Sequence, residues 1–226
     1  MKKEYQEALW DAYIEIAEVP KHQKKYLKTI GNSLMQEVPF LYRIYGLIGE
    51  QEEISECSEI GIHFEKEGES YILRQDTSGI LLKEEAMKKL IVDMTGLFEE
   101  ILPLGSVVDL KKEVLAEQMD LSEVDNFRVV ITKRFMGTGE GCYYPYGAVI
   151  YPIGTAGQGN VFSFTPALIG KTLFRGYEDW MEDEFVYQMK LELIVRQGRK
   201  SMGFASADER NVFFEQVQNR KEAANG

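Results

Sequence analysis

The sequence holds few of the residues on which most catalytic and metal sites depend. Of its 226 residues, two are cysteine and two are histidine. Cys57 and Cys142 lie in different halves of the chain, outside any Cys-x-x-Cys spacing, so we expect reduced thiols. His22 and His63 lack zinc-ligand spacing, and no Gly-x-Ser-x-Gly motif marks a nucleophile. The sequence therefore predicts a protein that is not an enzyme, with no catalytic residue, no metal site and no cofactor.

Long apolar runs are absent as well. The most apolar run, "FLYRIYGLIG" at residues 40–49, contains Arg43 and is far shorter than the roughly 20 residues that span a bilayer. The amino-terminal stretch "MKKEYQEALWDAYIEIAE" alternates charged and apolar residues, where an export signal would have an apolar core. We therefore expect a cytoplasmic protein without membrane insertion.

Positive charge is scarce. Lysine and arginine together number 26 against 37 aspartate and glutamate, which gives a net charge of -11 and a pI near 4.9. Binding to nucleic-acid phosphates or to anionic lipid requires clustered basic residues, so the composition disfavours both. A partner with a basic or neutral surface fits better.

Two glycine-rich stretches resemble phosphate-binding loops only superficially. They are "GTGEG" at residues 137–141 and "GTAGQG" at residues 154–159. Neither is followed by Gly-Lys-Ser/Thr, Glu140 lies inside the first, and the flanking residues are typical of strands. We interpret both as turns that join strands.

The spacing of apolar residues predicts an α+β protein with three regions. The first, residues 1–100, is helical with a hairpin, the second, residues 101–177, is rich in β-strands, and the third, residues 178–226, is helical. In the first region we expect helices over residues 4–19 and 21–37 and through "LLKEEAMKKLIVDMTGLFEEI", and a hairpin in "EIGIHFEKEGESYILRQDTSG".

The second region reads as a series of short strands rich in β-branched and aromatic residues. They are "SVVDL", "FRVVITKRF", "GAVIYPIG", "NVFSF" and "KTLFRGY", which predict a small β-barrel-like domain or a curled antiparallel sheet. The polar insertion at residues 113–126 is expected to be a loop or a short helix. In the third region an acidic amphipathic helix begins near Glu178, and a last helix begins near Ser206, which has capping-box spacing with Glu209.

Three stretches of the second region, in order, resemble an uncharacterised family of Gram-positive bacteria, domain-of-unknown-function family 4176. They are "ILPLGSVVDLKK", "YPYGAVIYPIG" and "FSF…LFRGYEDWMEDEF", and the resemblance covers about Leu102 to Phe185. Members of the family typically lie in gene clusters for LXG-type polymorphic toxins exported by the type VII secretion system. The resemblance therefore implies an accessory protein that binds a toxin as a chaperone or targeting factor, and it transfers no catalytic residue.

The tyrosine-rich strand and the acidic helix of this segment are the candidate contact surface for a protein partner. Because residues of a strand alternate between its two faces, the tyrosines cannot all point one way without a bulge. A mainly structural role for them is the simplest interpretation, a contact surface comes second, and a small-ligand pocket third. The candidate protein-binding residues are Tyr144, Tyr146, Tyr151, Glu178, Asp179, Trp180, Glu182 and Asp183.

Two other functions remain open at this stage. One is an immunity protein that blocks a toxin, since this too requires a soluble acidic binder. The other is an enzyme with an unrecognised site. The genes beside its own would discriminate among the three, and the sequence predicts neither the partner's identity nor the oligomeric state.

Overall fold

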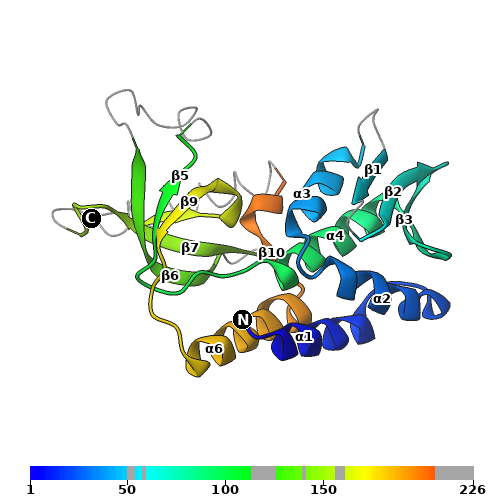
Figure 1. The fold of residues 1–226 in the computed structure, drawn as a ribbon, viewed down its shortest axis with the longest axis horizontal. Helices are drawn as coiled ribbons and strands as arrows, with labels where there is room; N and C mark the ends of the chain where they lie inside the picture. Colours follow the sequence, from blue (N-terminus) through cyan, green and yellow to red (C-terminus); the bar gives the residue numbers. More distant parts are fainter. Residues whose placement is uncertain (50–53, 58–59, 113–125, 139–140, 156–160, 207–226) are drawn as a thin grey trace, which may run out of the picture. The chain divides into compact units, whose positions relative to one another are not determined.

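The computed structural model describes residues 1–49, 54–57, 60–112, 126–138, 141–155 and 161–206 (Figure 1). The chain divides into two compact units. The first consists of Met1–Glu100 and Asp183–Gly198, and the second of Ile101–Glu182 and the chain from Arg199 onward. The three-part division made from the sequence stays a prediction.

Helices form most of the first unit. They are α1 (Lys3–Ile16), the 3-10 helix η1 (Lys21–Gln23), α2 (Lys24–Leu34), α3 (Val38–Leu47), α4 (Glu84–Phe98), the later part of α6 (Trp180–Lys190) and the π-helix η3 (Leu191–Arg196). The helices expected near residues 4–19 and 21–37 are confirmed, with shorter bounds. The sequence reading did not assign α3. Pro39 lies in its first turn, where the missing N–H costs no hydrogen bond.

A four-stranded antiparallel sheet completes the first unit. Its order is β1 (Ile54–Cys57), β2 (Ile62–Glu67), β3 (Ser70–Gln75) and β4 (Ser78–Lys83). The predicted hairpin is confirmed as β2 and β3. The start of "LLKEEAMKKL" was predicted as helix, but it belongs to β4, because Ile80 and Leu82 alternate into the core with a period of two.

The core of the first unit is apolar and contains large side chains. Trp10 is fully buried, stacks on Tyr13 with ring centroids 5.6 Å apart, and meets Phe98 edge-on at 5.2 Å. The helix α2 passes so close to this indole that a Cβ atom on Gly31 would lie 2.1 Å from Trp10 Cζ2. The apolar stripes predicted for α1, α2 and α4 are therefore the surfaces that pack together.

The second unit is built on a six-stranded sheet. Its strands are β5 (Val107–Leu110), β6 (Phe127–Gly137), β7 (Cys142–Ile150), β8 (Phe162–Phe164), β9 (Ile169–Phe174) and β10 (Lys200–Ser201). The order is β10-β7-β6-β5-β9, with β8 also paired to β7. All pairs are antiparallel except β10 with β7, which is parallel.

This sheet is curled and is not a closed barrel, so of the two predicted shapes the curled sheet is the one observed. Within the described residues β9 and β10 are its outer strands and do not pair with each other. Register shifts interrupt the pairing of β6 with β7 and, twice, that of β5 with β9. Such irregularities bend a strand and increase its twist.

Two short 3-10 helices, η2 (Pro166–Leu168) and η4 (Met202–Phe204), complete the described part of this unit. The predicted insertion at residues 113–126 and the predicted last helix lie almost wholly outside the described residues. In the part of the chain that the structure describes, no helix is both long enough and apolar enough to cross a membrane.

Candidate functional site

The three predicted tyrosines of β7 and its end have three different environments. Tyr146 is fully buried, and its ring packs 5.1 Å from that of Phe164. Its hydroxyl accepts a hydrogen bond from the main-chain N–H of Leu102 at 2.8 Å. Tyr144 is half-buried against a small cluster that includes Cys142, whereas Tyr151 is 50% exposed. A buried side chain cannot contact a partner in this structure, so Tyr146 belongs to the core of the unit.

The predicted acidic residues mostly hold the structure together. Asp179 caps α6, because its Oδ1 accepts hydrogen bonds from the N–H groups of Met181 at 2.9 Å and Glu182 at 3.3 Å. Glu182 forms a two-pronged ion pair with Arg134 of β6, and only 5% of the Arg134 side chain is exposed. These two carboxylates fix the start of α6 within the second unit.

The other two predicted carboxylates are also paired. Glu178 accepts from Arg175 Nε at 2.9 Å, and this hydrogen bond lowers the pKa of the Glu178 carboxyl. In the first unit, Asp183 lies 3.4 Å from the amino group of Met1. The expected acidic surface therefore consists of carboxylates that already have cationic or N–H partners.

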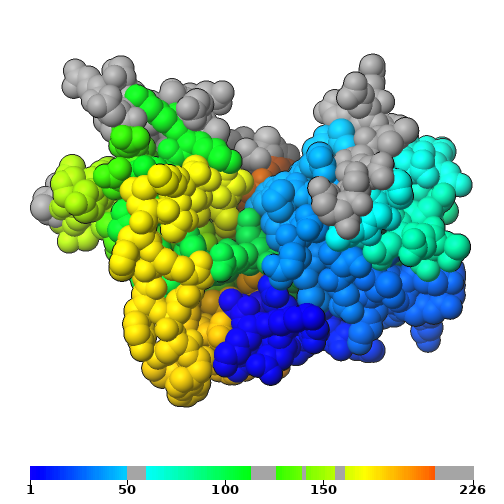
Figure 2. Space-filling view, in the orientation of Figure 1, coloured from blue at the N-terminus to red at the C-terminus, as the bar shows by residue number. Residues whose placement is uncertain are grey.

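Large apolar side chains are instead exposed between the end of β9 and the first turn of α6. Phe174 is 61% exposed, Tyr177 82%, Trp180 67% and Met181 57%. We call residues 174–181 the aromatic segment. It lies on the face shown in Figure 2, where the chain is coloured yellow. Scattered exposed apolar residues are normal, but a concentration of this kind in one short segment is typical of an interaction surface.

The aromatic segment is held in place by its backbone. The N–H of Gly176 donates to Ser106 Oγ at 3.0 Å, and Ser106 in turn donates to the main-chain oxygen of Pro103 at 2.8 Å. A Cβ atom on Gly176 would lie 2.0 Å from the main-chain oxygen of Leu104, so only glycine permits this close approach. The segment is therefore anchored at its centre while its large side chains face solvent.

The sequence reading included Trp180 in its candidate surface and missed Phe174, Tyr177 and Met181. The signal for them was present in "LFRGYEDWM", where three aromatic residues recur at three-residue steps around a glycine. It was missed because a strand is expected to bury one of its faces: Phe174 does end β9, as expected, but this strand is exposed along almost its whole length, and Tyr177 lies beyond it.

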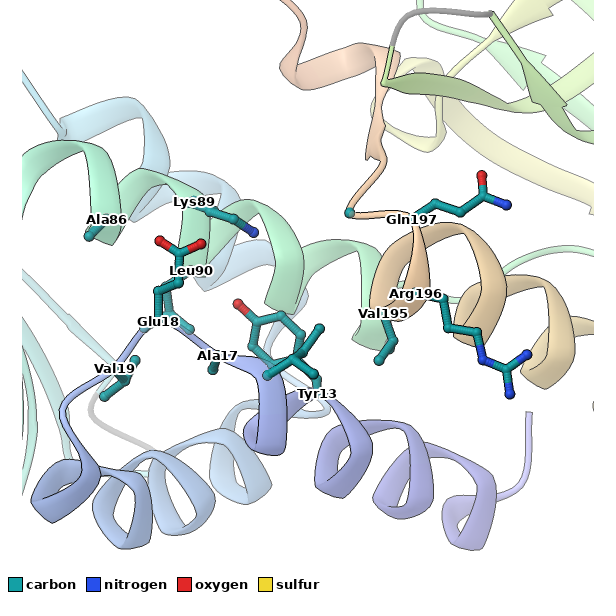
Figure 3. Close-up of a pocket in the computed structure, with 12 residues that line it drawn as sticks. Tyr13, Ala17, Glu18, Val19, Ala86, Lys89, Leu90, Val195, Arg196 and Gln197 are labelled. Atoms are coloured by element: carbon teal, nitrogen blue, oxygen red, sulfur yellow. The ribbon is translucent and has the colours of Figure 1, made fainter.

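The first unit contains a pocket of about 320 Å³ (Figure 3). It is lined by the carboxyl-terminal ends of α1 and η3 and by the first half of α4. On its wall, Tyr13 donates to Asp93 Oδ2 at 2.8 Å, and Lys89 Nζ approaches the same oxygen at 2.6 Å. Burial raises the pKa of both Tyr13 and Asp93, and the negative charge of Glu18 adds to each shift.

Metal-binding groups do not gather in the described part of the chain, where no three or more His, Cys, Asp or Glu side chains lie together as metal ligands would. Cys142 is buried and forms no disulfide. The described residues thus offer several candidate binding features: the aromatic segment, the pocket beside Tyr13, and two further pockets of the first unit, of about 440 and 370 Å³, which both include Arg74 and Asp76.

Comparison with known proteins finds a family match for one part of the chain. Residues 101–185 match the model of a family described as a domain of unknown function, DUF4176, which confirms the resemblance noted over Leu102 to Phe185. No curated protein and no solved structure matches the chain. The matched residues include the whole aromatic segment.

Proposed function

We propose that this protein, through its DUF4176 domain, is a non-enzymatic accessory factor that binds another protein. The proposed partner is an LXG-type toxin of the type VII secretion system, which the protein serves in the cytoplasm as a chaperone or targeting factor. The observation that carries the binding role is the aromatic segment, in which Phe174, Tyr177, Trp180 and Met181 are each more than half exposed.

The chemistry of this segment suits a protein interface. Tyrosine and tryptophan provide large, rigid contact area, and they are the residues that most often dominate the binding energy of interfaces. The contact of Gly176 with Leu104 and Ser106 fixes the backbone before a partner arrives. Less conformational entropy is lost on binding when the surface is already ordered.

The choice of partner is supported by the family resemblance and by charge. The chain carries a net charge of -11, which favours association with a basic or neutral surface over nucleic acid or a second acidic copy. The paired state of Glu178, Asp179 and Glu182 means that these carboxylates contribute to steering less than free ones would.

The test is binding to the LXG toxin encoded beside the gene of this protein, measured by surface plasmon resonance. We expect Tyr177→Ala and Trp180→Ala each to weaken binding about 30-fold, mainly through faster dissociation, since truncation of a central anchor costs roughly 2 kcal/mol. Ile153→Ala is the matched control, because Ile153 is 60% exposed in the same unit but lies outside the segment.

Two outcomes would contradict the proposal. If the folded Tyr177 and Trp180 variants bind like the parent, the aromatic segment is not the contact surface. If the protein binds only the toxic domain of the toxin and abolishes its activity, it is an immunity protein rather than a targeting factor. Separate preparations of the LXG part and the toxic part distinguish these cases.

A further inference from the structure

The outer strand β9 buries almost none of its side chains. In β5, and in the first part of β6, every second residue is buried, as is normal for strands that pack one face against a core. In β9 every residue from Gly170 to Phe174 is exposed, so both faces of this strand are uncovered within the described part of the unit. Leu173 is 39% exposed and Phe174 61%. Core packing therefore does not account for these apolar side chains.

One edge of β9 also has no strand beside it among the residues that the structure describes. The strand pairs with β5 on one side only (Figure 1). In an antiparallel pair, a strand directs part of its N–H and C=O groups to its neighbour and the others away from it. An outer strand thus presents a row of donors and acceptors with which another extended chain can pair.

The charge of this region differs from that of the rest of the chain. Although the sequence holds 37 acidic residues, none occurs between Glu140 and Glu178. The two cations of β9 and the aromatic segment are Lys171 and Arg175. Arg175 is paired with Glu178, whereas no carboxylate of the described ranges forms an ion pair with the exposed Lys171. Lys171 is therefore available to a carboxylate on an incoming strand.

A second copy of the protein fits this edge poorly. Symmetric pairing of two β9 strands would bring their Lys171 side chains close together, and each chain has a net charge of -11. The register of β9 with β5 also skips Gly170 and Leu173. Lysines and bulges are the means by which outer strands avoid pairing with their own kind. The lysine that repels a second copy attracts a strand with an acidic residue, so the charge selects a different protein.

We propose that a partner protein adds an extended segment to the outer edge of β9. The segment is mostly apolar and carries an acidic residue next to Lys171. The rest of the partner contacts the aromatic segment, which begins at Phe174, the last residue of β9. Leu104, which is 49% exposed and lies against Gly176, extends the same apolar surface. This inference rests on the proposed function and adds the way in which the partner is recognised.

Strand addition is tested by hydrogen–deuterium exchange of the full chain, alone and bound to the LXG toxin, read at single-residue resolution by fragmentation mass spectrometry. Alternate amides of β9, those directed away from β5, should exchange at least about tenfold more slowly in the complex, because they become hydrogen-bonded. The amides of β10, the other outer strand of the sheet, serve as the control and should not change.

The role of Lys171 is tested with a charge-matched pair of variants. Lys171→Glu should weaken toxin binding about tenfold, because it replaces an attractive cross-strand pair by a repulsive one. Lys133→Glu makes the same change of charge at an exposed position of the inner strand β6 and should weaken binding less than about twofold. Circular dichroism establishes that both variants are folded. An equal effect of the two substitutions would overturn the proposed charge recognition.

The remaining outcomes separate this inference from the proposed function. If the toxin binds and protects only residues 175–181, the partner uses the aromatic segment without adding a strand, so this inference fails and the proposed function stands. If the toxin does not bind at all, both fail. Sedimentation equilibrium of the protein alone should give equal masses for the parent and Lys171→Glu. A parent mass that falls on this substitution would assign the edge to a second copy and overturn the proposal.

Discussion

Lys190 donates a hydrogen bond from its ammonium group to the main-chain oxygen of Leu97, 2.9 Å away. A second one reaches the main-chain oxygen of Glu99 at 2.5 Å. These oxygens lie at the carboxyl-terminal end of α4, where helix carbonyls lack partners within the helix and where α4 has no basic residue of its own. A fully buried lysine on α6 thus caps another helix of the first unit.

Replacing this lysine should destabilise the protein. Lys190→Met keeps much of the volume but leaves the buried carbonyl oxygen of Leu97 without a donor, at about 1–3 kcal/mol, and the partly buried one of Glu99, at about 1 kcal/mol. Urea denaturation should therefore show a loss of roughly 2–4 kcal/mol in the free energy of unfolding. Lys3→Met, at a side chain that is 82% exposed, is the control and should lose less than about 1 kcal/mol. Equal losses of unfolding free energy in Lys190→Met and Lys3→Met would show that the hydrogen bonds of Lys190 to α4 do not stabilise the protein.

The carboxyl of Glu99 should make stability depend on pH. Burial raises its pKa from 4.5 to about 7, although hydrogen bonds from Tyr42 and the charge of Lys190 oppose the shift. The folded protein therefore binds this proton more tightly than the unfolded chain does. Its contribution to stability is complete below pH 4.5 and is lost as the pH rises through about 7.

The Glu99→Gln variant isolates this effect, since glutamine does not titrate. The unfolding free energy of the parent minus that of the variant, measured from pH 4 to pH 8, should fall by on the order of 3 kcal/mol over this range. A difference for Glu99→Gln that is flat, or that rises with pH, would contradict the burial of an ionisable carboxyl here.

Removal of two neighbouring carboxylates should lower the free energy of unfolding by different amounts. Glu182→Ala breaks the pair with Arg134, whose side chain is only 5% exposed, and should cost about 3 kcal/mol because a buried guanidinium loses its counter-charge. Glu178→Ala breaks the exposed pair with Arg175 and should cost about 0–1 kcal/mol. Urea titrations of both variants check this, and a larger loss for Glu178→Ala would be inconsistent with the structure.

Two helical glycines should respond in opposite directions to alanine. At Gly31 the added methyl group would overlap the indole of Trp10, so Gly31→Ala should destabilise by about 1–3 kcal/mol. At Gly46, on α3, nothing lies within 4 Å of the new atom, and Gly46→Ala should stabilise by about 0.5–1 kcal/mol. Thermal unfolding of the two variants gives the comparison, and a stabilised Gly31→Ala would rule out the close packing of α1 and α2.

The two tryptophans should report opposite environments. Trp10 is fully buried, whereas Trp180 is 67% exposed. Acrylamide should therefore quench the fluorescence of the parent strongly, and the emission that remains in Trp180→Phe should be blue-shifted and weakly quenched. If Trp180→Phe is quenched as strongly as the parent, Trp180 is not accessible in solution and the aromatic segment loses its main anchor.

Local patterns in the sequence determined the secondary structure well where one face of an element meets the core. The helical spacing of Leu9 and Tyr13, and of Leu27 and Ile30, predicted α1 and α2, because burial on one side selects that period. The alternation of Ile62 and Phe64 predicted β2 in the same way. The family resemblance, too, was available from short motifs alone.

Tertiary structure decided what the polar and aromatic residues do. Sequence patterns cannot show that Glu182 meets Arg134, 48 residues away, or that Tyr146 reaches Leu102 across 44 residues. These contacts turned an expected acidic surface into paired carboxylates, and they place Tyr146, a candidate contact residue, in the core, in agreement with the structural role that was the simplest interpretation of the tyrosines. Packing of segments that are far apart in the chain likewise decides the exposure of Phe174 and Tyr177 and brings the ends of α1 and η3 to one pocket. The physical reason is that burial depends on all neighbours in space, whereas sequence periodicity records only the neighbours along the chain.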